Sequence, residues 1–487
     1  MENKIKVALV NPRMFIKAYS FFPLALGYLA AALENEKIPY SFYDLHIDWG
    51  KNTEFIKQVK RDGVPDLFAI TGLLTSFQNV RDLIETIKEN FPVSQVVLGG
   101  KITVMGPEFL FAHTGTDFII QGEGEIALVE LVNEIENNHT YDTVQGLSYR
   151  DEYGNVISHG EAKPVRTLSE YSIPYERFDM GKYIERCNIQ SPDVRSINIL
   201  SSRGCPFTCT FCNNSGTKSP VRFYDISGLK DSLDYLITNF QLKHVTFNDD
   251  IFTVNKRHMK EICECLKERN LSFSISTRLD FLDEESIKNL DESGCSYLCI
   301  GIESPSPIVA KVIDKELDLK KYQKNIDALK SSNIVVNFGF IFGYLGETEE
   351  SIKETREFVL KNKIIYSAFF ANAFPKTRLY DLIREKIPDE EEYLKRLFKV
   401  DLSKDYLVNM TDIPSDRLYL LRDQLIADSV INAINITIPL PKQLLRMAAL
   451  AYLVFMRKYG LRFSLFKQLF EFLNMIVVKP LTKKAPA

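Results

Sequence analysis

Apolar segments of strand length alternate with amphipathic segments over the first 140 residues. The strand-like runs lie at 6–10, 40–45, 67–71, 95–98 and 118–121, and helical patterns cover 23–33, 77–90 and 125–136. Strands that alternate with helices predict a parallel, doubly wound sheet of the α/β class. Ligands bind such a sheet beyond the carboxyl ends of its strands.

A second series of strand and helix patterns follows. Candidate strands lie at 196–200, 244–247, 272–276, 297–301, 335–342 and 366–371, and candidate helices at 229–239, 257–269, 284–292 and 320–331. Between the two series, residues 148–158 predict a hairpin with Gly154 in its turn. From Glu390 onward the pattern is helical, with an amphipathic segment at 416–433. We therefore expect an N-terminal domain at 1–140, a connector at 141–194, a central domain at 195–390 and a helical C-terminal region at 391–487.

The composition excludes several classes of protein. The 487 residues are 45% hydrophobic and 25% charged, with a net charge of −4, which fits a globular chain and gives no electrostatic footprint for nucleic acid. We expect no signal peptide, because the first apolar run is too short, and no apolar stretch reaches the ~20 residues that span a bilayer. A cytoplasmic location is the expectation.

One C-terminal segment keeps a second location open. Residues 443–478 are apolar and basic. They predict either a helical cap on the central domain or a helix that contacts a membrane surface or a lipophilic substrate.

Three cysteines, Cys205, Cys209 and Cys212, follow the first strand of the central domain with the spacing Cys-x-x-x-Cys-x-x-Cys. Cysteine thiolates are the usual ligands of iron–sulfur clusters. Three ligands on a four-iron cluster leave one iron open to chelate the amino and carboxylate groups of a methionine moiety. A zinc site would need a fourth ligand, and the next thirty residues contain no Cys or His.

The other five cysteines predict buried free thiols, with a second cluster as the alternative. They are Cys187, Cys263, Cys265, Cys295 and Cys299.

Small and polar residues stand at the expected strand ends of both domains. In the N-terminal domain these are Asn11-Pro12, Thr71-Gly72, Gly99-Gly100-Lys101 and Gly122-Glu123-Gly124-Glu125. In the central domain they are Asn248-Asp249-Asp250, Thr277-Arg278-Leu279-Asp280, Gly301-Ile302-Glu303-Ser304 and the segment 342–348. Each could be a plain turn, but a series of such ends predicts a ligand site.

These motifs resemble the cobalamin-dependent (B12-binding) radical S-adenosylmethionine (SAM) family, and within it the class B methyltransferases. The resemblance covers roughly residues 5–400. It rests on the cysteine motif with Arg203-Gly204 before it and Phe211 inside it, and on the strand ends above together with 23–30. It implies a flavodoxin-like (Rossmann-like) cobalamin-binding domain followed by a partial (β/α)6 TIM-type radical SAM barrel.

The resemblance also implies site residues. Cys205, Cys209 and Cys212 would hold a [4Fe–4S] cluster. SAM would contact Phe211, Asp249, Arg278, Glu303 and Gly343. Cobalamin would contact Pro12, Thr71, Gly72, Thr75, Gly99, Gly100, Gly122 and Glu123.

Several roles stay open beside these assignments. Asp249 or Asp250 would bind the methionine amine, or one of them would cap the next helix. Arg278 and Glu303 could instead be ion-paired at the barrel rim. His46 does not fit the spacing of a cobalt-ligating loop, and we expect it at the surface or in a turn. Lys376 stands where relatives commonly have glycine.

The implied reaction is methyl transfer from methylcobalamin to an unactivated carbon or phosphorus centre, with one SAM supplying a 5′-deoxyadenosyl radical and a second renewing the methyl group. Oxidative cyclisation or ring rearrangement on the same cofactors is the alternative, and a non-catalytic cobalamin or redox sensor is the alternative of another class. The expected partners are a small-molecule substrate, with a lipophilic one left open, and an external one-electron reductant of the flavodoxin or ferredoxin type. Nucleic acid is not expected, and peripheral membrane contact through the C-terminal helices stays open.

Overall fold

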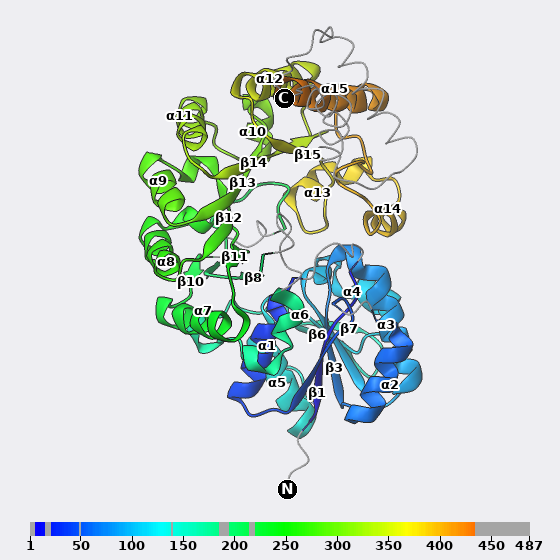
Figure 1. Cartoon of the computed structure of the whole chain (residues 1–487). Helices are drawn as coiled ribbons and strands as arrows, with labels where there is room; N and C mark the ends of the chain where they lie inside the picture. Colours follow the sequence, from blue (N-terminus) through cyan, green and yellow to red (C-terminus); the bar gives the residue numbers. More distant parts are fainter. Residues whose placement is uncertain are drawn as a thin grey trace, which may run out of the picture.

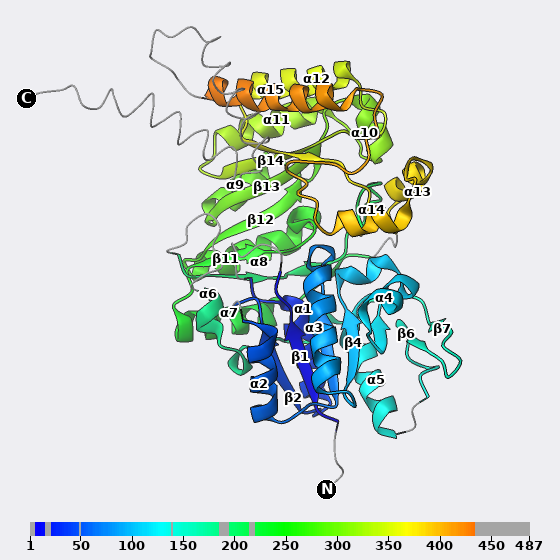
Figure 2. The same cartoon turned by 90° about the vertical axis from the view of Figure 1, so that its right-hand side faces the viewer.

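The computed structural model describes residues 5–14, 21–47, 50–137, 140–184, 194–213 and 220–433. It consists of two α/β halves stacked one above the other, with the N-terminal half at the bottom in both views (Figures 1 and 2). The apolar basic segment at 443–478 and Cys187 lie outside the described residues.

The N-terminal sheet has seven strands in the order β2-β1-β3-β4-β5-β6-β7. The strands are β1 (Val7–Asn11), β2 (Tyr40–Asp44), β3 (Leu67–Thr71), β4 (Gln95–Gly99), β5 (Phe118–Ile120), β6 (Leu147–Arg150) and β7 (Val156–Ser158). The first five are parallel and have the flavodoxin-like order, as predicted.

Helices cover both faces of this sheet. They are α1 (Leu24–Asn35), α2 (Asn52–Asp62), α3 (Phe77–Asn90), α4 (Pro107–Thr114) and α5 (Gly124–Asn137). Alternate residues of β1 face opposite sides, so that Leu9 packs with α1 and α5, whereas Val10 packs with α2 and α3. The strand runs away from the chain's N-terminus, which places the carboxyl ends of the parallel strands toward the upper half (Figure 1).

The domain boundary expected at residue 140 is too early. The hairpin β6–β7, which we placed in the connector, pairs antiparallel with β5 and extends the N-terminal sheet to Ser158. Gly154 has φ 84° in its turn, as the hairpin prediction requires. A short helix, α6 (Met180–Ile184), then leads to the upper half.

The upper half contains six parallel strands in the order β8-β11-β12-β13-β14-β15. They are β8 (Ser196–Ile199), β11 (His244–Phe247), β12 (Ser272–Arg278), β13 (Cys295–Glu303), β14 (Val335–Phe342) and β15 (Tyr366–Phe370). Each strand pairs with the next in sequence, and β15 does not pair with β8, so the barrel is partial, as predicted. Between β8 and β11 lies a short antiparallel pair, β9 (Ser202–Arg203) and β10 (Arg222–Phe223).

Helices cover the outside of the barrel. They are α7 (Ile226–Phe240), α8 (Lys256–Glu268), α9 (Glu284–Glu292), α10 (Pro307–Ile313), α11 (Leu319–Lys330), α12 (Glu349–Asn362), α13 (Arg378–Ile383), α14 (Glu390–Leu397) and α15 (Ser415–Ala433). The described part of the C-terminal region contains two helices joined by the non-helical segment 398–414: α15 packs on α12 at the top of the molecule, and α14 faces the N-terminal half (Figure 2). Phe398, just after α14, stacks on Phe77 of α3 with ring centroids 4.1 Å apart. Among the described residues, no helix is long and apolar enough to cross a membrane.

Candidate functional site

The three cysteines of the motif lie together on one loop. Cys205, Cys209 and Cys212 belong to the segment 204–213, which follows β9 at the carboxyl end of the first barrel strand, and all three are partly exposed free thiols. The backbone N–H of Cys212 donates to the carbonyl of Cys209 over 3.0 Å, which turns the loop back on itself. The loop thus presents thiols at the edge of the barrel where chemistry is expected.

Thr210, between the second and third cysteines, anchors the loop. Its buried hydroxyl lies 2.9 Å from the carbonyl of Val312 and 2.6 Å from the Tyr344 hydroxyl. Its backbone N–H donates to Ile313 at the end of α10, and its carbonyl accepts from the N–H of Leu379 in α13. Contacts from three separate elements therefore fix the backbone beside Cys209.

Arg278, the last residue of β12, lies against the cysteine loop. Its guanidinium is 3.7 Å from the sulfur of Cys209 and 3.8 Å from the centroid of the Phe207 ring. Two hydrogen bonds to Asp280, of 3.0 and 2.8 Å, orient it. Burial raises the pKa of the Cys209 thiol, and the charge of Arg278 opposes that rise. Arg278 thus favours the thiolate that a metal cluster requires.

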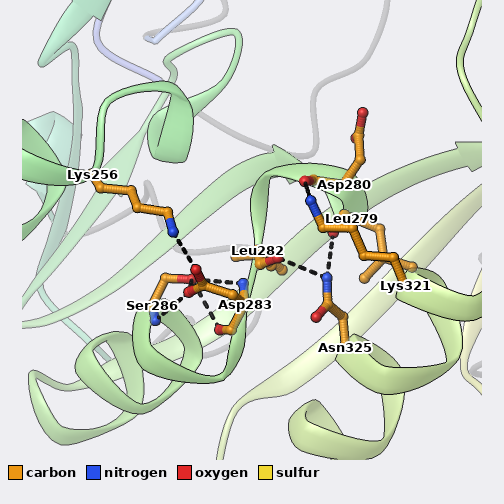
Figure 3. A network of polar contacts seen from close by, with 8 residues as sticks. All are labelled: Lys256, Leu279, Asp280, Leu282, Asp283, Ser286, Lys321 and Asn325. Atoms are coloured by element: carbon orange, nitrogen blue, oxygen red, sulfur yellow. Dashed lines mark hydrogen bonds and ion pairs between the residues drawn. The ribbon is translucent and has the colours of Figure 1, made fainter. Parts of the chain in front are cut away.

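The segment that carries Asp280 is held by its neighbours (Figure 3). Asn325 of α11 donates to the carbonyls of Leu279 and Leu282 over 2.9 and 2.8 Å, and Lys321 donates to the carbonyl of Asp280 over 2.5 Å. Asp283 caps α9 and accepts from Lys256. This network keeps the loop after β12 in one conformation and thereby keeps Arg278 on the cysteine loop.

The donor set suits a cluster better than a single ion. Within the described part of the chain, no three His, Cys, Asp or Glu side chains converge closely enough to hold one metal ion. A four-iron cluster binds each thiolate through a different iron, so its ligands surround a larger group. Three thiols on one partly exposed loop, with Arg278 beside them, fit that requirement.

Glu303, the last residue of β13, carries an ion pair within the barrel rim. Its carboxylate lies 3.4 Å from the ammonium of the buried Lys315, which also donates to the Gly301 carbonyl over 2.6 Å. A Cβ on Gly301 would lie 2.2 Å from the Glu303 carboxylate, which would have to move aside. Arg278 and Glu303 therefore each have an ion-pair partner, Asp280 and Lys315 respectively.

Asp249, after β11, is buried and binds hydroxyls of the protein itself. Its two carboxylate oxygens accept from the backbone and side chain of Ser201 and from the hydroxyl of Ser202, over 2.6–2.8 Å. Burial raises its pKa to about 6, although the serine hydrogen bonds oppose the rise. Asp250 beside it is exposed, and its charge adds to the effect of burial in raising the pKa of Cys205. Neither aspartate caps the next helix, because Asn255 caps α8.

Gly343 ends β14 with φ 74°, in the conformation that favours glycine. Its N–H donates to the carboxyl of Glu347 over 2.6 Å. A Cβ at this position would lie 3.2 Å from Leu418 of α15. The Gly343 turn therefore joins the barrel rim to the C-terminal helix.

The buried Glu347 gives a testable pH dependence. Burial raises its pKa from 4.5 to about 8, although backbone N–H groups of Gly343 and Tyr344 donate to it. Because the folded-state pKa lies above the unfolded one, this group's contribution to stability is complete below pH 4.5 and is lost as the pH rises through about 8. We expect Glu347→Gln, which stays neutral, to match the wild-type unfolding temperature at pH 5 and exceed it at pH 9. Calorimetry at both pH values tests this, and a difference independent of pH would contradict it.

The carboxyl ends of β3 and β4 form one joined edge in the N-terminal domain. The N–H of Gly72 donates to Gly99, and the carbonyl of Gly72 accepts from Ile102, over 3.0 and 2.9 Å. Gly100 has φ 85°, and a Cβ there would lie 2.6 Å from the Thr71 hydroxyl. Only glycine allows the two loops to meet this closely at Gly100.

The other residues expected at this edge differ in exposure. Pro12 is buried, Thr75 is exposed, and Gly122 is exposed with φ 93° against Ala162. Glu123 is engaged by Arg222, with oxygens 2.6 and 2.9 Å from its guanidinium nitrogens. His46 lies in the turn after β2, one of the two locations expected for it, but it is buried rather than at the surface, and the N–H of Met14 donates to its ring nitrogen over 3.3 Å.

Comparisons with known proteins identify both halves. The B12 binding domain family matches residues 18–132, and the Radical SAM superfamily matches residues 199–359. An uncharacterised methyltransferase of Pyrococcus horikoshii is 30% identical over 380 residues, which are 74% of this chain and 78% of that protein. The chain belongs to the cobalamin-dependent radical SAM enzymes. An anaerobic magnesium-protoporphyrin IX monomethyl ester cyclase of Cereibacter sphaeroides is 26% identical, over 80% of this chain and 64% of the cyclase.

Solved structures of cobalamin-dependent radical SAM enzymes share the fold. TsrM, a radical SAM methyltransferase of Kitasatospora setae, superposes with a TM-score of 0.66 at 18% identity, over 79% of this chain and 75% of TsrM. OxsB superposes with a TM-score of 0.70 at 20% identity, over 97% of this chain and 75% of OxsB. These likenesses show the two-domain architecture and leave the substrate open.

Sequence reasoning missed several charged residues of this radical SAM enzyme. Lys315 lies outside any motif, and its burial depends on the fold around β13. Arg222 became recognisable only when β9 and β10 were placed, whereas Glu125 belongs to the predicted Gly122-Glu123-Gly124-Glu125 motif and only its pairing with Arg203 was missed. Lys376 has φ 62°, in the region that favours the glycine common in relatives, and pairs with Glu161 over 3.3 Å at an exposed position.

Proposed function

We propose that this enzyme is a methyltransferase that acts on an unactivated carbon or phosphorus centre of a small molecule. The observation that carries the proposal is the relationship to the Pyrococcus methyltransferase over 78% of that protein, in a chain that has both a B12 binding domain and a radical SAM domain. When bound, the cluster and SAM supply a carbon radical, and cobalamin supplies the methyl group. The protein holds these groups and excludes water.

Within this proposal the cysteine loop holds the cluster. Cys205, Cys209 and Cys212 are the ligands, and the anchors of Thr210 keep the loop backbone in place. Arg278 places a fixed positive charge beside Cys209, which favours the negatively charged sulfur ligands. Reduction of the cluster requires an external one-electron donor, for which we propose a flavodoxin or ferredoxin.

SAM is proposed to bind along the barrel rim beside the cysteine loop. Gly301 leaves space below Glu303, whose carboxylate would turn from Lys315 to a polar group of SAM. Phe211 lies next to Cys212 on the loop, and Gly343 ends the neighbouring strand β14. The exposed Asp250 is better placed for the methionine amine than Asp249, whose two oxygens are occupied by serines.

Cobalamin is proposed to lie on the carboxyl edge of the N-terminal sheet. The joined glycine loops give it a flat backbone surface, and Thr71 and Thr75 offer hydroxyls for its amide side chains. The remaining proposed contacts are Pro12, Gly72, Gly99, Gly100 and Gly122. Glu123 is not proposed as a cobalamin contact, because its carboxylate is hydrogen-bonded to Arg222.

Oxidative cyclisation is the second candidate, favoured by the 26% identity to the magnesium-protoporphyrin monomethyl ester cyclase. A labelling experiment separates the two. The protein, reconstituted anaerobically with iron, sulfide and hydroxocobalamin, is reduced and given SAM labelled in its methyl group. We expect S-adenosylhomocysteine and cobalamin that carries the labelled methyl group. Retention of the label in SAM, with both cofactors bound, would contradict the methyltransferase proposal and favour the cyclase.

A further inference from the structure

Four charged side chains meet between the N-terminal sheet and the barrel. Arg203 of β9 lies 2.6 Å from Glu125 of α5 and 3.6 Å from Glu123. Arg222 of β10 lies 2.6 Å from Glu123, which also accepts from the N–H of Val165 over 2.7 Å. The two glutamates therefore bind two arginines and the connector at once.

This ion cluster is removed from water and rigidly built. The side chains of Arg203 and Arg222 are each 12% exposed, and that of Glu125 is 5% exposed. The guanidinium of Arg203 also lies over the Tyr28 ring of α1, 4.2 Å from its centroid. Loss of one partner would leave a buried charge uncompensated, so the pairing holds the two halves in one arrangement at this point.

The two arginines lie in the short paired strands from which the cysteine loop begins. Arg203 directly precedes Gly204 and Cys205, and Arg222 is its partner in the β9–β10 ladder. Contacts that fix the β9–β10 ladder therefore fix the position at which the cysteine loop begins.

The two glutamates stand at the end of β5, on the edge proposed for cobalamin. Glu123 follows Gly122, where a Cβ would lie 3.0 Å from the carbonyl of Ala162, so the backbone turn before it is fixed. The Gly122-Glu123-Gly124-Glu125 motif thus reaches from the cobalamin edge to the base of the cysteine loop.

We propose that Glu123 and Glu125 are positioning residues that set the distance and orientation between the iron–sulfur cluster and cobalamin, through Arg222 and Arg203. The inference rests on the proposed function, because it requires both groups to be bound. A general role in holding the halves together belongs to other contacts, such as the stacking of Phe398 on Phe77. The ion cluster instead fixes β9 and β10, and thereby the start of the cysteine loop.

The test measures the relation of the two cofactors directly. Wild type, Glu123→Gln, Arg222→Lys and the double variant Glu123→Gln/Glu125→Gln are reconstituted with cluster and cobalamin, and iron and cobalamin contents are determined. Electron paramagnetic resonance then reports the spin–spin interaction between the reduced cluster and cob(II)alamin. Glu161→Gln is the matched control, because its exposed pair with Lys376 also joins the two halves.

We expect Glu123→Gln and the double variant Glu123→Gln/Glu125→Gln to bind both cofactors while the spin–spin interaction falls at least twofold and its distribution broadens. Arg222→Lys keeps the charge but not the paired hydrogen bonds, and it should give an intermediate value. Glu161→Gln should equal the wild type. The same interaction in wild type, Glu123→Gln and Arg222→Lys would overturn the inference, whereas a wild type that binds no cobalamin would contradict the proposed function itself.

Discussion

The Cys209→Ala variant is expected to lose its iron–sulfur cluster and all detectable 5′-deoxyadenosine formation. The loop around this residue is anchored through Thr210 to α10, α13 and Tyr344, so the fold should persist while one of three thiolates is missing. A cluster with two protein ligands is held too weakly to survive reduction and SAM binding. Iron and sulfide analysis, together with the visible absorption of the reconstituted protein, measures the loss.

Cys263→Ala is the matched control for this change. Cys263 is buried in α8, and burial raises its pKa to about 12, so its thiol stays protonated. We expect this variant to keep the wild-type iron content. Equal iron contents in Cys209→Ala and wild type would refute the assignment of the cluster to the cysteine loop.

The Gly100→Ala variant is expected to lose cobalamin, with an affinity at least tenfold lower, while keeping its iron. The new Cβ would lie 2.6 Å from the Thr71 hydroxyl and 2.8 Å from the Gly72 carbonyl, which forces the two loops of the cobalamin edge apart. The cysteine loop belongs to the other half of the molecule, so we expect this substitution to leave it unaffected. The cobalamin retained after gel filtration measures the loss of cobalamin affinity, and the iron content of the same sample shows whether the cluster is kept.

Gly115→Ala separates this clash from backbone strain. Gly115 has φ 68°, and a Cβ there would have no atom within 4 Å. Both substitutions place alanine at a positive φ, which costs ~1–2 kcal/mol in the left-handed region of Gly115 (ψ 15°) and up to ~3 kcal/mol at Gly100 (ψ −170°), but only Gly100→Ala disturbs the proposed site. Equal cobalamin binding in the two variants would argue against a cobalamin edge at β3 and β4.

Much of the fold was predictable because most strands of both sheets are parallel and alternate with helices along the chain. Apolar runs at 40–45 and 244–247 became β2 (Tyr40–Asp44) and β11 (His244–Phe247), with limits that differ by one residue at most. The hairpin was also predicted, but its pairing with β5 was not. Local periodicity shows that a strand exists, and it carries no information about the neighbour to which that strand bonds.

The site was predictable only where one short motif contains it. The cysteine spacing and the glycine-rich ends are local, and their roles as ligands stay predictions. Arg203 and Glu125 are 78 positions apart, and no pattern along the chain announces that they meet. Asp249 was singled out by its motif, but the serines that occupy its carboxylate are 47 and 48 positions away. Side chains that bridge two domains become recognisable only after both domains are placed.

The central claim is that this chain performs radical cleavage of SAM at the cysteine loop. The most direct measurement is mass spectrometry of the products after the reconstituted wild-type protein is given SAM and a strong reductant without oxygen, beside Cys209→Ala. We expect 5′-deoxyadenosine from the wild type alone. Absence of 5′-deoxyadenosine from a wild type that holds both cluster and cobalamin would contradict it.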